Sequence, residues 1–132
     1  MKKHLVVKYK NCNQIIIDTP ARLERILKTV ADKCGLTSLG SVSHRFAPQG
    51  VTAVLITAES HIRISTWPET GEAYVDFFSC KPKTNFMLAV KVIAKEIKST
   101  QCDVAIMDRD HHKILDRFSL SVIEECTAEE LI

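Results

Sequence analysis

The sequence predicts one α+β domain, a two-layer α/β sandwich in which a mostly antiparallel sheet carries two helices on one face. Three observations lead to this prediction. Strand-like runs outnumber helical runs, most connections between them are short, and 132 residues suffice for a single buried core. The composition, with 45% apolar and 26% charged residues, is ordinary for a soluble globular protein.

Helical and strand periods alternate along the first half of the chain. Residues 4–10 predict a strand, and Thr19-Pro20 predicts a helix start with Thr19 as N-cap. Gly35 is a typical helix stop, followed by a strand at 41–46, a turn at 48–50 and an apolar central strand at 51–58. The helix carries one apolar stripe at spacings of three and four, formed by Leu23, Ile26, Leu27, Val30, Ala31 and Cys34.

The second half repeats this alternation. Strands are predicted at 61–66 and 72–78, then a helix capped by Thr84, then strands at 102–108 and 113–118. The helix shows apolar residues at helical spacing, namely Met87, Val90, Ala94 and Ile97. Beyond Ser119 the pattern weakens, and the acidic residues there predict a solvated end or a short helix.

Charge and cysteine usage restrict the partners and the compartment. The net charge is +2 without any block of like charges, so we expect neither a nucleic-acid nor a membrane partner. No apolar run is long enough to span a bilayer, and Met1-Lys2-Lys3 does not begin a signal peptide. We expect no metal site, and free thiols in a reducing cytoplasm, because the cysteines are odd in number and lack CxxC spacing: Cys12, Cys34, Cys80, Cys102 and Cys126.

The segment 58–80, AESHIRISTWPETGEAYVDFFSC, concentrates the reactive side chains. Ser60 follows an apolar strand, and strict alternation would turn the side chain of His61 away from that of Ser60. Pro68 has no N–H for a sheet ladder, so the strand should end near Trp67. An aromatic beside a carboxylate, as in Trp67-Pro68-Glu69, suits a ring-bearing polar ligand. The alternative is a plain hairpin with a surface Ser-His pair and a core tryptophan.

This segment, together with HRFAPQGVTAVLI at 44–56, resembles the short prokaryotic S-adenosylmethionine decarboxylases. Glu-Ser-His, then Thr-Trp-Pro-Glu, then Cys at this spacing is a specific combination. The resemblance implies a fold of two related halves. It also implies a homodimer in which each active site lies near the interface between the protomers.

The resemblance further implies that the chain cuts itself between Glu59 and Ser60. The products would be a β chain, 1–59, and an α chain, 60–132, that opens with a pyruvoyl group made from Ser60. Decarboxylating an amino acid requires an electron sink, which a pyruvoyl ketone supplies without metal or pyridoxal phosphate.

Five further residues take expected roles from the resemblance. Cys80 would protonate the substrate carbon after carbon dioxide leaves, unless it is a small buried hydrophobe. Thr52 fills the place of a processing serine, or is simply a β-branched strand residue. Phe46 and Trp67 would form an adenine pocket, or pack in the core. Glu69 would grip the ribose hydroxyls, or lie in a solvated turn.

The chain departs from the family at three places. Ser65 stands where the family usually has a processing histidine, five residues after the cleavage-site serine. Arg63 replaces a small or polar residue, and Lys81-Pro82 follows Cys80 where a glycine is usual. A serine is a poor base near neutral pH, so these departures predict slow or absent self-cleavage.

The expected function is decarboxylation of S-adenosylmethionine, which supplies the aminopropyl donor for spermidine synthesis. Two alternatives stay open. One is a pyruvoyl-dependent decarboxylase of arginine or ornithine. The other is an uncleaved, inactive homologue that acts as a binding or partner subunit.

Overall fold

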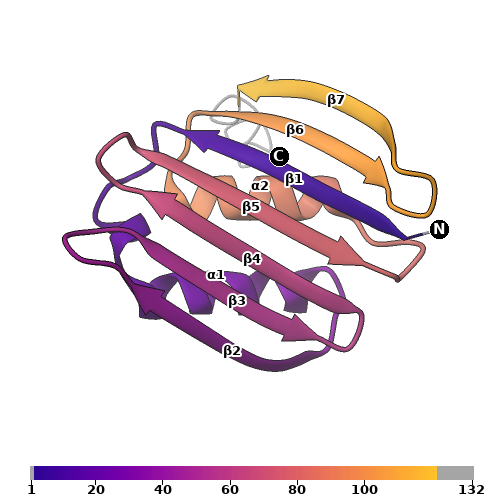
Figure 1. Cartoon of the computed structure of the whole chain (residues 1–132), viewed down its shortest axis with the longest axis horizontal. Coiled ribbons are helices and arrows are strands. Elements are labelled where there is room, and N and C mark those ends of the chain that lie inside the picture. The colour runs from indigo at the N-terminus through magenta and orange to yellow at the C-terminus, as the bar shows by residue number, and fades with distance from the viewer. Residues whose placement is uncertain (1, 122–132) are drawn as a thin grey trace, which may run out of the picture.

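A computed structural model describes residues 2–121. One sheet of seven strands is ordered β2-β3-β4-β5-β1-β6-β7, and every neighbouring pair within it is antiparallel (Figure 1). The elements are β1 Lys3–Lys10, a 3-10 turn η1 Ile16–Asp18, α1 Pro20–Lys33, β2 Ser38–Arg45, β3 Val51–Thr57, β4 Ser60–Trp67, β5 Glu72–Ser79, α2 Phe86–Ile97, β6 Gln101–Asp108 and β7 Lys113–Ser121.

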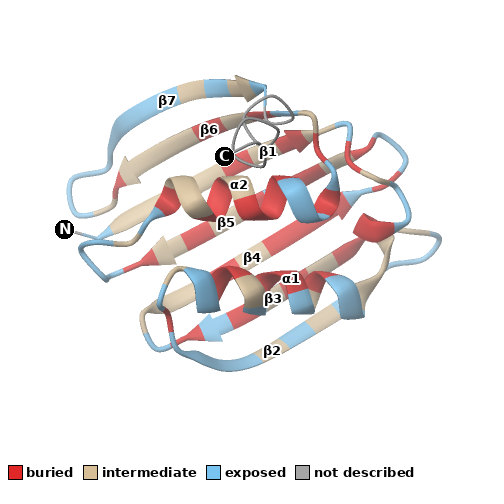
Figure 2. Cartoon of the chain, turned by 180° about the vertical axis from the view of Figure 1, so that it is seen from behind, coloured by how far each residue is buried: buried red, intermediate tan, exposed pale blue. Residues whose placement is uncertain are grey.

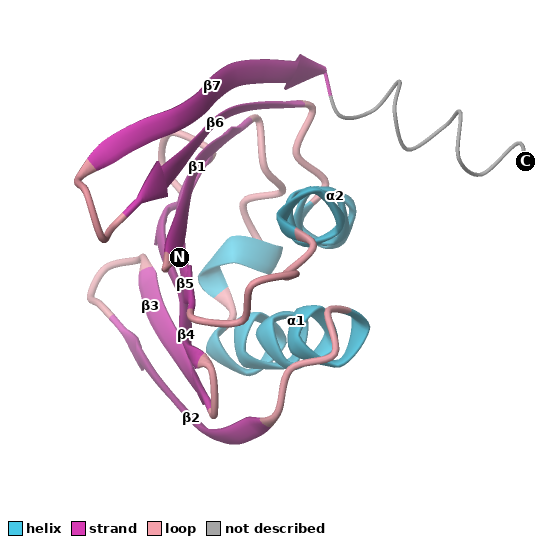
Figure 3. Ribbon diagram, turned by 90° about the vertical axis from the view of Figure 1, so that its right-hand side faces the viewer, coloured by secondary structure: helices cyan, strands magenta, loops and turns pink. Residues whose placement is uncertain are grey.

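Both helices cover the same face of the sheet, as the edge-on view shows (Figure 3). The predicted two-layer α/β sandwich is therefore confirmed. The order strand–helix–strand–strand occurs twice, as β1-α1-β2-β3 and as β5-α2-β6-β7, with β1 and β5 paired near the middle of the sheet. Within residues 2–121, the opposite face of the sheet, called the open face below, carries no helix.

Alternation along each strand separates the core from the open face. On β4, Ile62 and Ile64 are fully buried on the helix side, so the intervening Arg63 lies on the open face. Figure 2 shows the helix side, where buried segments of the sheet lie beneath both helices. The predicted stripe of α1 packs on the same core, where Leu23, Leu27 and Val30 are completely buried. Burial of this continuous apolar layer is the main favourable term in folding.

Several local expectations differ from the structure. Asn85, not Thr84, caps α2, since its side chain accepts a hydrogen bond from the Leu88 N–H at 3.0 Å. Thr84 instead bonds with Ser79 and with a turn carbonyl. Thr19 occupies the N-cap position of α1, but its hydroxyl donates to the Ile15 carbonyl rather than capping the helix. The predicted strand at 113–118 is confirmed and extends to Ser121.

The short connections place two hairpin turns at opposite ends of β4. The β3–β4 turn precedes Ser60, and the β4–β5 turn follows Trp67, so the two turns lie on opposite sides of Figure 1. The expected solvated end or short helix after Ser119 falls largely outside the described residues, as does Cys126. Within residues 2–121, neither helix has the length and apolar character needed to cross a membrane.

The buried hydroxyl of Tyr9 ties β1 to α2 by donating to the Val90 carbonyl at 2.8 Å. Tyr9→Phe keeps the ring but removes this bond, so we expect the free energy of unfolding to fall by about 0.5–1.5 kcal/mol. Urea titration measures the change. The control is Tyr74→Phe, because Tyr74 is partly exposed on the open face and its change should stay within about 0.5 kcal/mol. Equal losses in the two variants would contradict the assignment.

Candidate active site

The predicted cleavage site lies in the tight turn between β3 and β4. Thr57 pairs with Ser60 across the turn, which leaves only Ala58 and Glu59 in the loop. The Thr57 hydroxyl accepts a hydrogen bond from the Ser60 N–H at 2.9 Å, and the Glu59 carboxylate accepts one from the Thr37 N–H at 3.1 Å. The peptide bond between Glu59 and Ser60 is therefore fixed from both sides.

Cys80 lies beside this bond. It is the first residue after β5, and the pairing of Ser60 with Ser79 brings it next to the turn. The Cys80 N–H donates to the Glu59 carbonyl oxygen at 3.1 Å. Because the Cys80 side chain is exposed, it is not a small core hydrophobe. An N–H aimed at a carbonyl stabilises negative charge that develops on that oxygen during nucleophilic attack.

The side chain of His61 lies toward Ser60, so the expectation that it points away was wrong. Ser60 Oγ and His61 Nδ1 are 3.1 Å apart. Ser60 is the first residue of β4 and has a φ of 157°, outside the negative range of regular strands. Strict alternation therefore does not hold at this position.

The other predicted residues meet in a pocket at the opposite end of β4. This cavity of about 340 Å³ contains Thr52 and Ser65, which pair directly across β3 and β4 and whose hydroxyl oxygens are 3.0 Å apart. Arg63 donates to Ser65 Oγ at 3.1 Å. The remaining predicted site residues that line the same cavity are Phe46, Trp67 and Glu69.

Both aromatic residues of this pocket are half-exposed, with 48% of Phe46 and 46% of Trp67 accessible, so neither packs in the core. The loop that carries Phe46 is held by Asp18, which accepts bonds from the Gly50 N–H and from Arg45, each at 2.8 Å. The Gly50 N–H, followed by Arg45, lowers the pKa of Asp18 below its ordinary value. The loop is thus anchored by an ionised carboxylate.

The two groups of predicted residues do not meet within one chain. Ser60 and Ser65 both lie on β4, and five residues of strand span about 16 Å. One group, called the cleavage cluster, consists of Glu59, Ser60 and Cys80. The other, called the pocket cluster, consists of Phe46, Thr52, Ser65, Trp67 and Glu69.

Sequence reasoning missed a charged network in the middle of the open face. Asp76 accepts from His4 and from Arg63 Nη2, the latter at 3.2 Å, and Arg109 contacts the other nitrogen of His4 at 2.7 Å. Burial alone would raise the pKa of Asp76, but the bonds from His4 and Arg63 outweigh it and lower the pKa. Arg63 and Asp76 stand directly opposite each other in the β4–β5 register, a pairing that an alignment of the predicted strands would have suggested.

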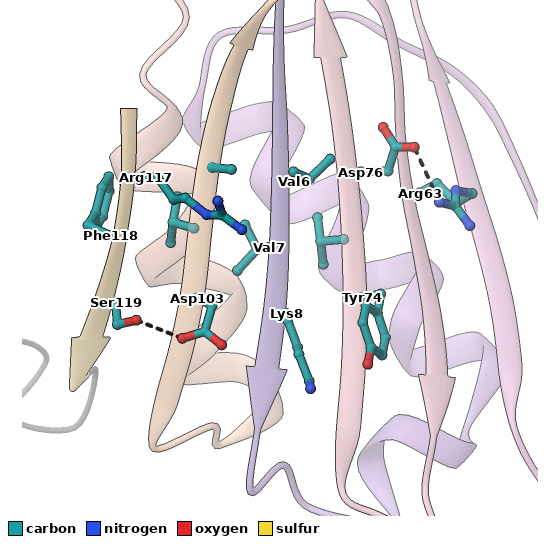
Figure 4. A pocket seen from close by; sticks show the side chains of 13 residues that line it. Val6, Val7, Lys8, Arg63, Tyr74, Asp76, Asp103, Arg117, Phe118 and Ser119 are labelled. Carbon is teal, nitrogen blue, oxygen red and sulfur yellow. Dashed lines mark hydrogen bonds and ion pairs between the residues drawn. The ribbon is translucent and has the colours of Figure 1, made fainter. Parts of the chain in front are cut away.

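A larger cavity of about 660 Å³ lies on the same face across β4, β5, β1, β6 and β7. Figure 4 shows its mixed lining, with Lys8 near the Tyr74 ring, Asp103 bonded to Ser119, and Arg63 bonded to Asp76. It contains none of the predicted site residues. Among residues 2–121, no group of three or more His, Cys, Asp or Glu side chains could hold a metal ion.

Comparisons with known proteins place the chain in a family. A family model described as S-adenosylmethionine decarboxylase matches residues 3–110. A relative from Methanococcus aeolicus, named S-adenosylmethionine decarboxylase proenzyme, is 37% identical over 107 residues, which cover 81% of this chain and 92% of the relative. One of the same name from Synechococcus sp. (strain WH7803) is 41% identical over 97 residues, covering 74% and 76%.

Solved structures show the same fold. The crystal structure of the adenosylmethionine decarboxylase from Aquifex aeolicus matches with a TM-score of 0.76 and 28% identity, covering 83% of this chain and 90% of that chain. A Trypanosoma brucei AdoMetDC-delta26 monomer, 13% identical with a TM-score of 0.58, covers 96% of this chain and 50% of that chain, and shows the fold alone.

The fold and the family match define the class of pyruvoyl-dependent, self-processing decarboxylases. Within that class, the chain belongs to the S-adenosylmethionine decarboxylase family.

The ionised form of Asp76 stabilises the fold, because its lowered pKa means that the folded protein binds this proton less readily than the unfolded chain does. That contribution is present at neutral pH and is lost as the pH falls through the lowered pKa. We therefore expect Asp76→Asn to destabilise the protein at pH 7, and expect its difference from wild type to shrink below about pH 4. Denaturant titration at both pH values measures this. Asp32→Asn, at an exposed site on α1, is the control, and a pH-independent deficit in Asp76→Asn would contradict the charge effect.

Proposed function

We propose that this chain is the precursor of a pyruvoyl-dependent S-adenosylmethionine decarboxylase and that it cleaves itself between Glu59 and Ser60. The observation that carries the proposal is the environment of the Glu59 carbonyl. The Ser60 hydroxyl is adjacent in the chain, and the Cys80 N–H already donates to the carbonyl oxygen at 3.1 Å. A nucleophile and an oxyanion donor therefore flank the same peptide bond.

Cleavage would leave the residue derived from Ser60 at the start of the new α chain, beside Cys80. A pyruvoyl group there supplies the electron sink for decarboxylation. The Cys80 thiol is exposed at the end of β5, so it can reach a substrate bound at the cleavage cluster. Proton return to the substrate carbon is the role that this position supports.

The pocket cluster supports a nucleoside substrate. Its half-exposed Phe46 and Trp67 offer ring faces to adenine and to a sulfonium cation, which an aromatic face attracts as it attracts an ammonium. Glu69 lines the same cavity and is exposed, so it can accept hydrogen bonds from ribose hydroxyls. Arginine or ornithine, the alternative substrates, carry no ring or ribose that would use these side chains.

A dimer reconciles the two separated clusters. If two copies stack open face on open face, about a two-fold axis that runs across the strands, strand directions oppose each other. The cleavage cluster of one protomer then lies over the pocket cluster of its partner. Exposed apolar side chains support this surface: Val42 and Ile56 on neighbouring strands are 62% and 51% accessible. We therefore propose a homodimer with two shared sites.

Shared sites predict complementation between defective chains. Ser60→Ala should leave the chain uncleaved and inactive, and a Trp67→Ala/Glu69→Ala chain should cleave but bind substrate poorly. When the two chains are co-expressed with different tags, the heterodimer should show about half of wild-type decarboxylation, because one of its two sites would be intact. Carbon dioxide release from the doubly purified heterodimer measures this.

The matched control for complementation places both defects in one chain. A Ser60→Ala/Trp67→Ala/Glu69→Ala chain paired with wild type gives heterodimers in which each site carries a defect. These should be nearly inactive if sites are shared and half-active if each site lies within one chain. The second result would overturn the shared site without touching self-cleavage.

Glu69→Gln tests the substrate. We expect S-adenosylmethionine to bind about 1–3 kcal/mol more weakly, because a charged acceptor for the ribose hydroxyls is lost. Calorimetry on an uncleaved Ser60→Ala background measures binding without turnover. Methionine, which lacks ribose, is the control ligand, and equal affinities for S-adenosylmethionine would favour an amino-acid substrate or an inactive homologue.

A further inference from the structure

The residue at the position of the family's processing histidine is too far from Ser60 of the same chain to accept its proton. That position holds Ser65, and about 16 Å of β4 separates it from Ser60. Ser65 is also engaged locally, since Arg63 donates to its oxygen and Thr52 is 3.0 Å away. In the proposed dimer the partner subunit's Ser65 would lie over Ser60, but a serine hydroxyl is a poor base near neutral pH, so the proton of the Ser60 hydroxyl needs another acceptor.

We propose that His61 is that acceptor: it acts as the general base for attack of Ser60 Oγ on the Glu59 carbonyl. The inference rests on the proposed self-cleavage. Ser60 Oγ and His61 Nδ1 are 3.1 Å apart, within the reach required of a general base. Among the described imidazoles, only His61 is hydrogen-bonded to Ser60.

The surroundings of the imidazole fit this role. Its ring stacks on Phe78 with the planes 8° apart, which fixes its orientation. Asp76 Oδ1 lies 3.9 Å from Nε2, so a carboxylate faces the nitrogen that must keep its proton while Nδ1 accepts. A carboxylate at this place also stabilises the imidazolium that forms.

Other charged and titratable side chains face the same region. Asp76 is itself bonded to His4 and Arg63, and Arg109 lies over the Phe78 ring at 5.9 Å. Hydrogen bonds from His4 and Arg63 hold the pKa of Asp76 below its ordinary value, and the guanidinium groups of Arg63 and Arg109 limit how much further positive charge this region accepts.

The proposed step is an acyl shift that neither gains nor loses atoms. Ser60 Oγ forms a bond to the Glu59 carbonyl carbon as its proton passes to His61 Nδ1. The carbonyl oxygen takes up the negative charge and is held by the Cys80 N–H. The carbon–nitrogen bond then breaks, and the proton returns from His61 to the Ser60 nitrogen, which leaves Glu59 and Ser60 joined by an ester.

The test follows cleavage of newly made chains over time after a pulse of cell-free translation. His61→Ala removes the base, and His61→Asn keeps a hydrogen-bonding side chain that cannot take the proton. Both should slow cleavage by about 10²–10⁴-fold. His44→Ala is the control and should cleave at close to the wild-type rate, and Ser65→Ala tests whether the pocket cluster takes part. Circular dichroism and thermal unfolding confirm that each variant folds.

Hydroxylamine separates the acyl shift from the later elimination, because it cleaves esters but leaves peptide bonds intact. Uncleaved His61→Ala chains should resist hydroxylamine, since they stop before the ester. The wild-type cleavage rate should fall as the pH is lowered, because a protonated imidazole cannot accept a proton. The residual rate of His61→Asn should lose that dependence.

Each remaining outcome overturns the proposal in a distinct way. Near wild-type cleavage of His61→Asn would mean that the imidazole only orients Ser60. Hydroxylamine-sensitive His61→Ala chains would move the base to the elimination step. Normal cleavage of His61→Ala, with loss in Ser65→Ala, would place the base in the pocket cluster. A wild-type chain that never cleaves would overturn self-processing itself, and the role of His61 with it.

Discussion

The antiparallel register of β3, β4 and β5 is the constraint on which both parts of the site depend. It sets Ser60 opposite Ser79, which delivers the Cys80 N–H to the Glu59 carbonyl, and it sets Thr52 opposite Ser65. A slip of one residue would move every side chain of β4 to the other face. Burial of Ile62 and Ile64 against the helices opposes such a slip.

The same register explains why the open face carries charge. Arg63 and Asp76 are cross-strand partners, and His4 joins them from β1 on the far side of β5. In the proposed dimer, this network would be buried away from solvent. A buried ion pair of this kind costs desolvation, but it fixes how two surfaces align better than apolar contacts alone. Apolar side chains around the network would supply the favourable burial.

Much of the fold could be predicted from local patterns in the sequence, because each strand or helix has its own periodicity. The apolar stripe of α1, the stop at Pro68 and the central strand at β3 were all readable from spacing. Asn85 took the cap expected of Thr84, whose hydroxyl instead donates to the Lys81 carbonyl in the preceding turn. The proximity of Cys80 to Glu59 depends on strand pairing, which periodicity does not report.

The site was harder to predict because motif spacing does not give spatial distance. Ser60 and Ser65 are five residues apart, and strand geometry turns that short interval into about 16 Å. The predicted direction of the His61 side chain was wrong for a different reason. The alternation of a regular strand was applied to Ser60, which is the first residue after a turn. The error for His61 arises at the start of β4, where regular alternation meets a hairpin.

Two departures from the family, Arg63 and Ser65, are linked by physical contact. The guanidinium of Arg63 lies 3.1 Å from Ser65 Oγ. A histidine at position 65 would have to hold a proton beside that cation, and like charge disfavours the protonated form. Serine accepts a bond from arginine at no such cost. Arg63 and Ser65 therefore belong together, and a chain with both needs its base elsewhere, as at His61, whose Nε2 lies 3.9 Å from Asp76 Oδ1.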